Sequence, residues 1–187
     1  MREEVAESIR ESATAGALLV VVAALAVLTG RSFLFPSLGP SAFLLATRPA
    51  APASSPRRVA GGHAVGILAG LAAYHGIASG PLLAASAPAL TAPAPTLVAP
   101  PPALTASSVA LAASGVVSVV LTTAGMVVAD LRHAPACATT LIVSLGLLSS
   151  LADALLVGVA ICVLLATHRA LVSARVAPAP TVVEEPN

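Results

Sequence analysis

The feature that most constrains the fold of this chain is a set of long apolar runs that carry almost no charge. Residues 13–29 and 106–128 contain no charged side chain, and residues 150–171 contain only Asp153 and Arg169. Each run approaches the roughly 20 apolar residues that a helix needs to cross a bilayer. Only 9% of the residues are charged, against about a quarter in a soluble domain. The sequence therefore predicts an all-α membrane protein.

Three further apolar segments bring the number of predicted transmembrane helices to about six, and two of the three are short and broken. Residues 61–79 are long enough for a full span, whereas residues 33–47 and 134–149 are interrupted, the first at Pro40 and the second at Pro135. A proline fits the first turn of a helix, where its missing N–H costs no hydrogen bond. Each of these prolines is therefore expected to start a half-helix.

The predicted transmembrane domain covers residues 13–172 and is flanked by polar segments. Residues 1–12 predict either a short interfacial helix or a frayed, solvated tail, and their four glutamates argue against a secretory signal. Residues 80–105 hold seven prolines and no charge, which predicts an extended external loop. Residues 173–187 are expected to form a disordered tail.

The basic residues predict the orientation of the chain in the cytoplasmic membrane. All nine basic residues are arginines, and a six-span path places eight of them on one side and only Arg31 on the other. Basic residues mark the cytoplasmic side, so both termini are expected in the cytoplasm. The alternative makes the two short segments re-entrant, which leaves four full spans.

The two short segments occupy corresponding places in the chain. The predicted spans form two groups of three, residues 13–79 and 106–171, and each short segment is the second span of its group. Because each group has an odd number of spans, the two groups would have opposite orientations and form an inverted repeat. Paired short, proline-interrupted segments are the best sequence indication of a transporter's binding site. Chance similarity between two low-complexity segments is the competing interpretation.

Two half-helices that begin inside the membrane would direct unpaired N–H groups and positive dipole ends at the midplane, which suits a small anion. We therefore predict that the residues after Pro40 and Pro135 approach each other. Asp130 is expected to pair with Arg132 when the site is empty. The candidate anion-binding residues are Ser37, Gly39 and Ser41 in the first half and Arg132, His133, Ala136 and Thr139 in the second, with His63 as a secondary candidate.

The same residues allow simpler interpretations. Arg132 and His133 would also suit a cytoplasmic turn that contacts lipid phosphates, and His63 would suit a helix start satisfied by the turn at Gly61 and Gly62. The competing function is that of a membrane structural or assembly subunit without a substrate.

Small residues form two further faces. Gly62, Gly66 and Gly70 recur every fourth residue, and Ser114 and Ser118 do the same in residues 106–128. Such faces allow close helix approach in a bilayer. They predict tight packing, either inside the chain or in a homo-oligomer.

Several function classes find no support in the sequence. It has no paired-carboxylate site, GxSxG, HExxH or P-loop motif, so we expect no enzyme activity. Neither cysteine belongs to a CxxC or zinc pattern, so no metal or cofactor is predicted. The net charge of +1 gives no indication of nucleic-acid binding.

Three pieces of the sequence carry a family resemblance between residues 33 and 165. They are Phe35-Pro36-Ser37-Leu38-Gly39-Pro40-Ser41-Ala42, Pro56-Arg57-Arg58-Val59-Ala60-Gly61-Gly62-His63 and Arg132-His133-Ala134-Pro135-Ala136-Cys137-Ala138-Thr139-Thr140-Leu141-Ile142. In this order they resemble the HPP family of integral membrane proteins. The first proline of the family's His-Pro-Pro triplet is Ala134 here. The resemblance implies a multi-pass membrane protein, and members of the family have been linked to nitrite transport. A channel or secondary carrier for a small inorganic anion, with nitrite as the named candidate, is therefore expected.

Overall fold

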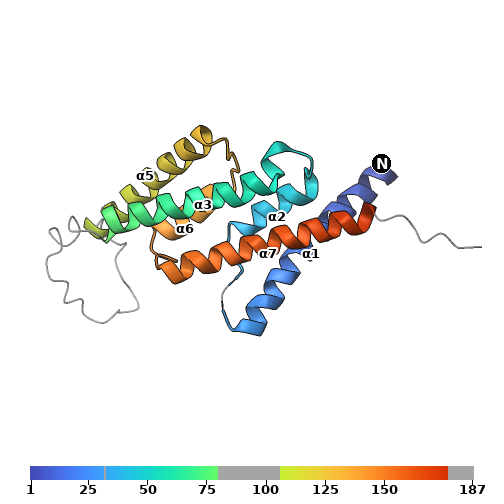
Figure 1. The fold of residues 1–187 in the computed structure, drawn as a ribbon, viewed down its shortest axis with the longest axis horizontal. Coiled ribbons are helices and arrows are strands. Elements are labelled where there is room, and N and C mark those ends of the chain that lie inside the picture. Colours follow the sequence, from blue (N-terminus) through green and yellow to red (C-terminus); the bar gives the residue numbers. More distant parts are fainter. Residues whose placement is uncertain (32, 80–105, 177–187) are drawn as a thin grey trace, which may run out of the picture.

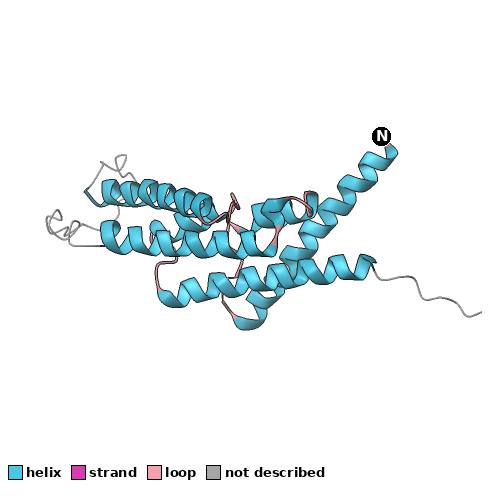
Figure 2. Ribbon diagram, turned by 45° about the horizontal axis from the view of Figure 1, so that its top comes forward, coloured by secondary structure: helices cyan, strands magenta, loops and turns pink. Residues whose placement is uncertain are grey.

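The computed structural model describes residues 1–31, 33–79 and 106–176, and this part of the chain is helical without a strand. Figure 1 shows an elongated bundle of helices, and in Figure 2 the loops drawn between described helices are short. The all-α prediction is confirmed. The elements are α1 (Arg2–Thr29), α2 (Leu38–Thr47), the 3₁₀ turn η1 (Pro52–Ser54), α3 (Pro56–Ala73), the π-helical turn η2 (Tyr74–Ala78), α5 (Ala106–Val128), α6 (Ala136–Ser144) and α7 (Leu151–Val176).

Three helices, α1, α5 and α7, are long and apolar enough to cross a membrane. Their outward surfaces carry large apolar side chains that are more than half exposed, among them Val27, Val120 and Leu155. Exposed apolar surface of this extent is unfavourable in water and suits contact with lipid. α3 and η2 together form a fourth long helical segment, because η2 follows α3 directly.

The two short helices lie along opposite halves of α3, as Figure 1 shows. α2 runs antiparallel to α3: its Ser41 reaches His63, and η1 links its C-terminus to the start of α3. α6 runs parallel to α3, because Gly62, Gly66 and Gly70 face successively later residues between 131 and 143. Both short helices therefore begin beside the same part of α3 and run away from each other.

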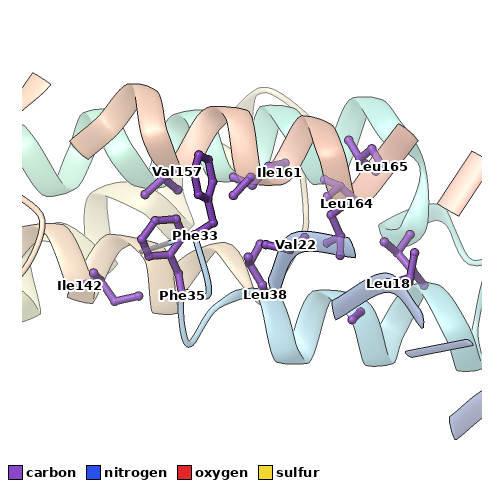
Figure 3. Packing of buried hydrophobic residues seen from close by; sticks show 14 residues of the cluster. Leu18, Val22, Phe33, Phe35, Leu38, Ile142, Val157, Ile161, Leu164 and Leu165 are labelled. Atoms are coloured by element: carbon purple, nitrogen blue, oxygen red, sulfur yellow. The ribbon is translucent and has the colours of Figure 1, made fainter. Parts of the chain in front are cut away.

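The segment that leads into α2 is not helical, and it is buried in the main apolar core. Phe33 lies between Val157 and Ile161 of α7, and Phe35 lies near Ile142 of α6 (Figure 3). Both phenylalanine side chains are at most 6% exposed. Protein surrounds this non-helical backbone, which is the condition under which such backbone is tolerated inside a membrane protein.

The glycine face of α3 is occupied by α6 within the same chain. A Cβ atom on Gly66 would lie 2.8 Å from the Ala136 carbonyl oxygen, and one on Gly70 would lie 2.9 Å from the Thr140 carbonyl oxygen. Ser114 and Ser118 of α5 are fully buried, and Ser114 donates to the Ser144 carbonyl. These faces serve packing inside the protomer. The homo-oligomer through these faces stays a prediction, and the contacts described here already fill the same positions within one chain.

Several element boundaries differ from the expected spans. α1 begins at Arg2, so the polar segment 1–12 forms its first turns. α3 begins at Pro56, five residues before the expected span, since Pro56 provides a favourable first helical residue. α7 continues to Val176, past the expected start of the tail. The proline-rich loop at residues 80–105 and the tail from residue 177 lie outside the described residues.

Candidate functional site

A buried polar cluster lies where α2 and α6 begin beside α3. The Ser41 hydroxyl of α2 lies at its centre, with Nε2 of His63 and Nε2 of His133 each 3.1 Å from Oγ. The two imidazole rings face each other with their centroids 5.1 Å apart. Ser41, His63 and His133 are completely buried.

The outer nitrogen of each imidazole also has a partner. Nδ1 of His63 lies 2.7 Å from the hydroxyl of Thr139 on α6, and Nδ1 of His133 lies 2.9 Å from the Ala53 carbonyl of η1. The cluster therefore joins α2, η1, α3 and α6. A continuous chain of four hydrogen bonds connects Thr139 to Ala53.

Local structure explains why these groups meet. Gly62 lacks a side chain where the Cβ of His133 approaches, since a Cβ on Gly62 would lie 2.9 Å from it. His63, the next residue on α3, lies at the height of α2's first turn. Ser41 lies one turn after Ser37, and its hydroxyl is also 3.0 Å from the Ser37 carbonyl.

Ser37 is the N-cap of α2, and its hydroxyl is the exception in this region. The Ser37 side chain is fully buried, yet its Oγ has no hydrogen-bond partner among the described residues. A buried hydroxyl without a partner costs about 1–3 kcal/mol. An unsatisfied polar group at a helix N-terminus is therefore a candidate contact for a bound ligand.

Two threonines, one on α5 and one on α6, form a second buried polar contact beside the cluster. The hydroxyls of Thr140 on α6 and Thr122 on α5 lie 2.7 Å apart, and both side chains are fully buried. Neither threonine is predicted from the sequence, because a threonine in an apolar helix gives no signal until its partner helix is known. The same holds for Ala53, which contributes through its backbone carbonyl alone.

The remaining predicted residues lie around the cluster rather than in it. Arg132 is exposed, although its neighbour His133 is buried. Gly39 is half-buried and faces open space. Ala136 is buried at the first position of α6, and its carbonyl accepts from Thr140.

The two prolines stand near the helix starts at different positions. Pro135 is the N-cap of α6. α2 begins at Leu38, two residues before Pro40, so the prediction that Pro40 starts this helix is wrong. Pro40 still lies in the first turn, where a missing N–H leaves no helical hydrogen bond unmade.

Asp130 pairs with arginines of α3 at the surface near the cluster. Arg58 Nη2 lies 2.7 and 2.9 Å from the two carboxylate oxygens, and Arg57 lies 3.8 Å away. The expected pairing with Arg132 is thus replaced by pairing with Arg58. The hydrogen bonds from Arg58 hold the pKa of the Asp130 carboxyl below its usual value, against an opposing effect of desolvation.

The chemistry available in the cluster is that of hydroxyl, imidazole and backbone groups. No carboxylate or thiol is a hydrogen-bond partner of these side chains in the described part of the chain. Within the same residues, no group of three or more histidine, cysteine, aspartate or glutamate side chains could hold a metal ion. The cluster suits a small polar ligand or a proton.

A family model described as "HPP, transmembrane region" matches residues 2–181, nearly the whole chain. The chain belongs to this family. No curated protein and no solved structure gives a significant match. The resemblance drawn from the three motifs is therefore confirmed.

Membership of the HPP family and the long apolar helices together establish an integral membrane protein. The three motifs that carried the resemblance converge on the cluster, which receives Ser41 from the first, His63 from the second and His133 with Thr139 from the third. Ala134, which replaces the first proline of the triplet, is exposed and makes no cluster contact.

Proposed function

We propose that this HPP-family protein passes a small inorganic anion across the cytoplasmic membrane, with nitrite as the first candidate. The observation that carries the proposal is the meeting of two half-helix N-termini at a buried cluster with one unsatisfied hydroxyl, that of Ser37. Nitrite as the substrate follows from the family resemblance alone. We propose that the protein transports this anion without catalysing a reaction.

The proposed path of the chain has six crossings, with both short segments crossing fully. In the first short segment, the non-helical residues 33–37 precede the helix α2, and in the second, residues 131–135 precede α6. Each crossing would combine such a non-helical part with a short helix. The antiparallel course of α2 and the parallel course of α6 along α3 support this path. The two halves would then form an inverted repeat whose broken segments meet at the cluster.

The orientation follows from the same path. The N-terminus of α1, the end of α7 and the start of α3 lie toward the same end of the bundle, where α1 and α7 project past α3 (Figure 1). Arg57 and Arg58 lie at this end, bonded to the turn after α5. We propose that this end faces the cytoplasm, which places both termini inside, while Arg31 lies across the membrane after the 28 residues of α1.

The anion would enter beside the Ser37 hydroxyl at the start of α2. That hydroxyl could donate to the anion, while the helix dipole and the neighbouring imidazoles supply further favourable polarity. The cluster is closed to solvent, as expected for the occluded state of a carrier. A secondary carrier is therefore favoured over an open channel.

Nitrite uptake into liposomes with purified protein tests the proposal. Wild-type protein should accelerate nitrite entry over protein-free liposomes, and Ser37→Ala should reduce that rate. Thr47→Ala, at the other end of the same helix, should behave like the wild type because its hydroxyl bonds only to the Phe43 carbonyl. Equal rates with and without protein would favour the alternative, a structural subunit without a substrate.

A further inference from the structure

The cluster admits one consistent arrangement of protons when both imidazoles are neutral. The Ala53 carbonyl can only accept, so His133 carries its proton on Nδ1 and its Nε2 accepts from the Ser41 hydroxyl. The Ser41 hydroxyl has one proton, so Nε2–H of His63 donates to it. Nδ1 of His63 then accepts from Thr139. All four hydrogen bonds run in one direction, from Thr139 to Ala53.

The same geometry accommodates one additional proton without breaking a hydrogen bond. When His133 is protonated on Nε2, it donates to Ser41 Oγ, which already accepts from His63. The Ser41 hydroxyl then turns to the Ser37 carbonyl, 3.0 Å away. The protonated state therefore differs from the neutral state by one proton on His133 and by the rotation of the Ser41 hydroxyl.

A second additional proton is disfavoured by the position of the rings. The imidazoles are 5.1 Å apart and fully buried, so two positive charges would repel strongly in a medium of low dielectric. The neighbouring helices add little charge. α2, η1 and α5 contain no titratable side chain, and α6 contains only Cys137. The other charged or titratable groups on α3, on residues 129–135 before α6 and on residues 151–174 of α7 are Arg57, Arg58, Asp130, Arg132, Asp153, Cys162, His168 and Arg169.

An additional proton and an anion would stabilise each other here. The imidazolium of His133 would form beside Ser41, one turn from the unsatisfied Ser37 hydroxyl. The positive dipole end of α2 disfavours a lone cation at this place, and a bound anion offsets that effect. Binding of one therefore raises the affinity for the other by the same factor.

We propose that Ser41, His63 and His133 form a proton-binding relay that makes the protein carry one proton with each anion. The proposal rests on the proposed function, and it adds the co-transported ion. The proton is taken up at His133 Nε2 on one side of the membrane and released on the other, with no covalent change.

Transport measurements test the coupling. Liposomes containing the protein and a pH-sensitive dye are given a nitrite gradient at zero membrane potential, and protein-free liposomes correct for permeation of nitrous acid. The expected result is internal acidification in step with nitrite entry, and its loss in His133→Gln. His75→Gln, whose imidazole bonds to the Ser149 carbonyl away from the cluster, should keep the coupling. Nitrite entry without proton entry would overturn the relay and leave the proposed function intact. Absence of any nitrite flux would overturn both.

Nitrogen NMR of the wild-type protein labelled at histidine tests the relay without a transport assay and without replacing a residue of the cluster. At neutral pH, His133 should be the Nδ1–H tautomer and His63 the Nε2–H tautomer. Acidification should produce a single imidazolium from the pair. His75→Gln and His168→Gln assign the remaining two signals. The same tautomer for both rings, or two protons taken up together, would contradict the relay.

Discussion

Ser37 and Ser41 lie one turn apart at the start of α2, yet their hydroxyls have opposite surroundings. Ser41 Oγ has three polar neighbours, whereas Ser37 Oγ has none among the described residues. A packed protein rarely keeps an unsatisfied buried hydroxyl unless it serves another purpose. Substitution of these two residues separates the role of a ligand contact from that of a structural contact.

Ser37→Ala should lower nitrite flux by about tenfold, since a hydrogen bond to a charged group contributes about 1.5–3 kcal/mol. It should leave the thermal midpoint in detergent unchanged or slightly higher, because the removed hydroxyl makes no bond in the empty protein. Thermal unfolding and flux are measured on the same preparation. A clear loss of stability would show that the Ser37 hydroxyl has a structural partner.

Ser41→Ala should show the opposite stability result. Removing Oγ leaves Nε2 of His63 and of His133 buried without a partner, and each unsatisfied group costs about 1–3 kcal/mol. The free energy of unfolding should therefore fall well below that of Ser37→Ala. Equal stability of the two variants would mean that the Ser41 hydrogen bonds contribute nothing.

At the scale of elements, the contact between α3 and α6 holds the two histidines in place. Gly66 lies against the backbone of α6, and a Cβ there would be 2.8 Å from the Ala136 carbonyl oxygen. Backbone atoms cannot yield as a flexible side chain can. The position of His133 beside His63 thus depends on the absence of a side chain at Gly66.

Gly66→Ala should destabilise the protein by about 1–3 kcal/mol, the usual cost of overpacking. Gly16→Ala on α1 is the matched control, because its Cβ would meet nothing within 4 Å and alanine favours a helix. Unfolding in detergent with increasing denaturant compares the two. If Gly66→Ala were as stable as Gly16→Ala, the α3–α6 interface would be looser than described.

The ion pair between Asp130 and Arg58 joins the start of α3 to the turn after α5. Arg58 lowers the pKa of Asp130, so the pair stabilises the folded state at neutral pH, and this contribution disappears as the pH falls through the lowered pKa. Asp130→Asn should therefore lower the thermal midpoint at pH 7, and the difference should shrink below about pH 4. Asparagine also tolerates the positive φ of 51° at this position. A difference that is independent of pH would argue against a role for the carboxylate charge.

The sequence predicted the elements of the site better than their contacts. The short helices near Pro40 and Pro135 follow from proline chemistry, which is local. Gly61 and Gly62 suggest a helix start beside His63, whereas α3 begins at Pro56 and this histidine is buried at the centre of the site. Arg132 lies outside the site because the non-helical backbone after α5 leaves it exposed and buries His133. The contributions of Thr122, Thr140 and the Ala53 carbonyl depend on tertiary packing, which no local pattern encodes.

At the scale of the whole molecule, the number of crossings decides whether the two half-helices meet from opposite sides. With six crossings, positions 31 and 48 lie on opposite sides of the membrane, whereas a re-entrant first segment places them on the same side. Arg31 and Arg48 are both exposed and suit replacement by cysteine.

Arg31→Cys and Arg48→Cys, each in a chain whose native Cys137 and Cys162 are replaced by alanine, should react with a membrane-impermeant maleimide from opposite sides. Position 48 should react from the cytoplasmic side in inverted vesicles, and position 31 from the outside in intact cells. Ser8→Cys, in the first turns of α1, provides the cytoplasmic reference. Reaction of both arginine positions from one side would support four spans.

The proposed transport of a small anion is tested most directly by measuring anion flux through the purified protein. Liposomes that contain it are compared with protein-free liposomes for nitrite, nitrate, formate and chloride. Nitrite should move faster with protein, and Ser37→Ala should lower this flux without lowering stability. If the protein accelerates none of the four anions, the proposed transport is contradicted.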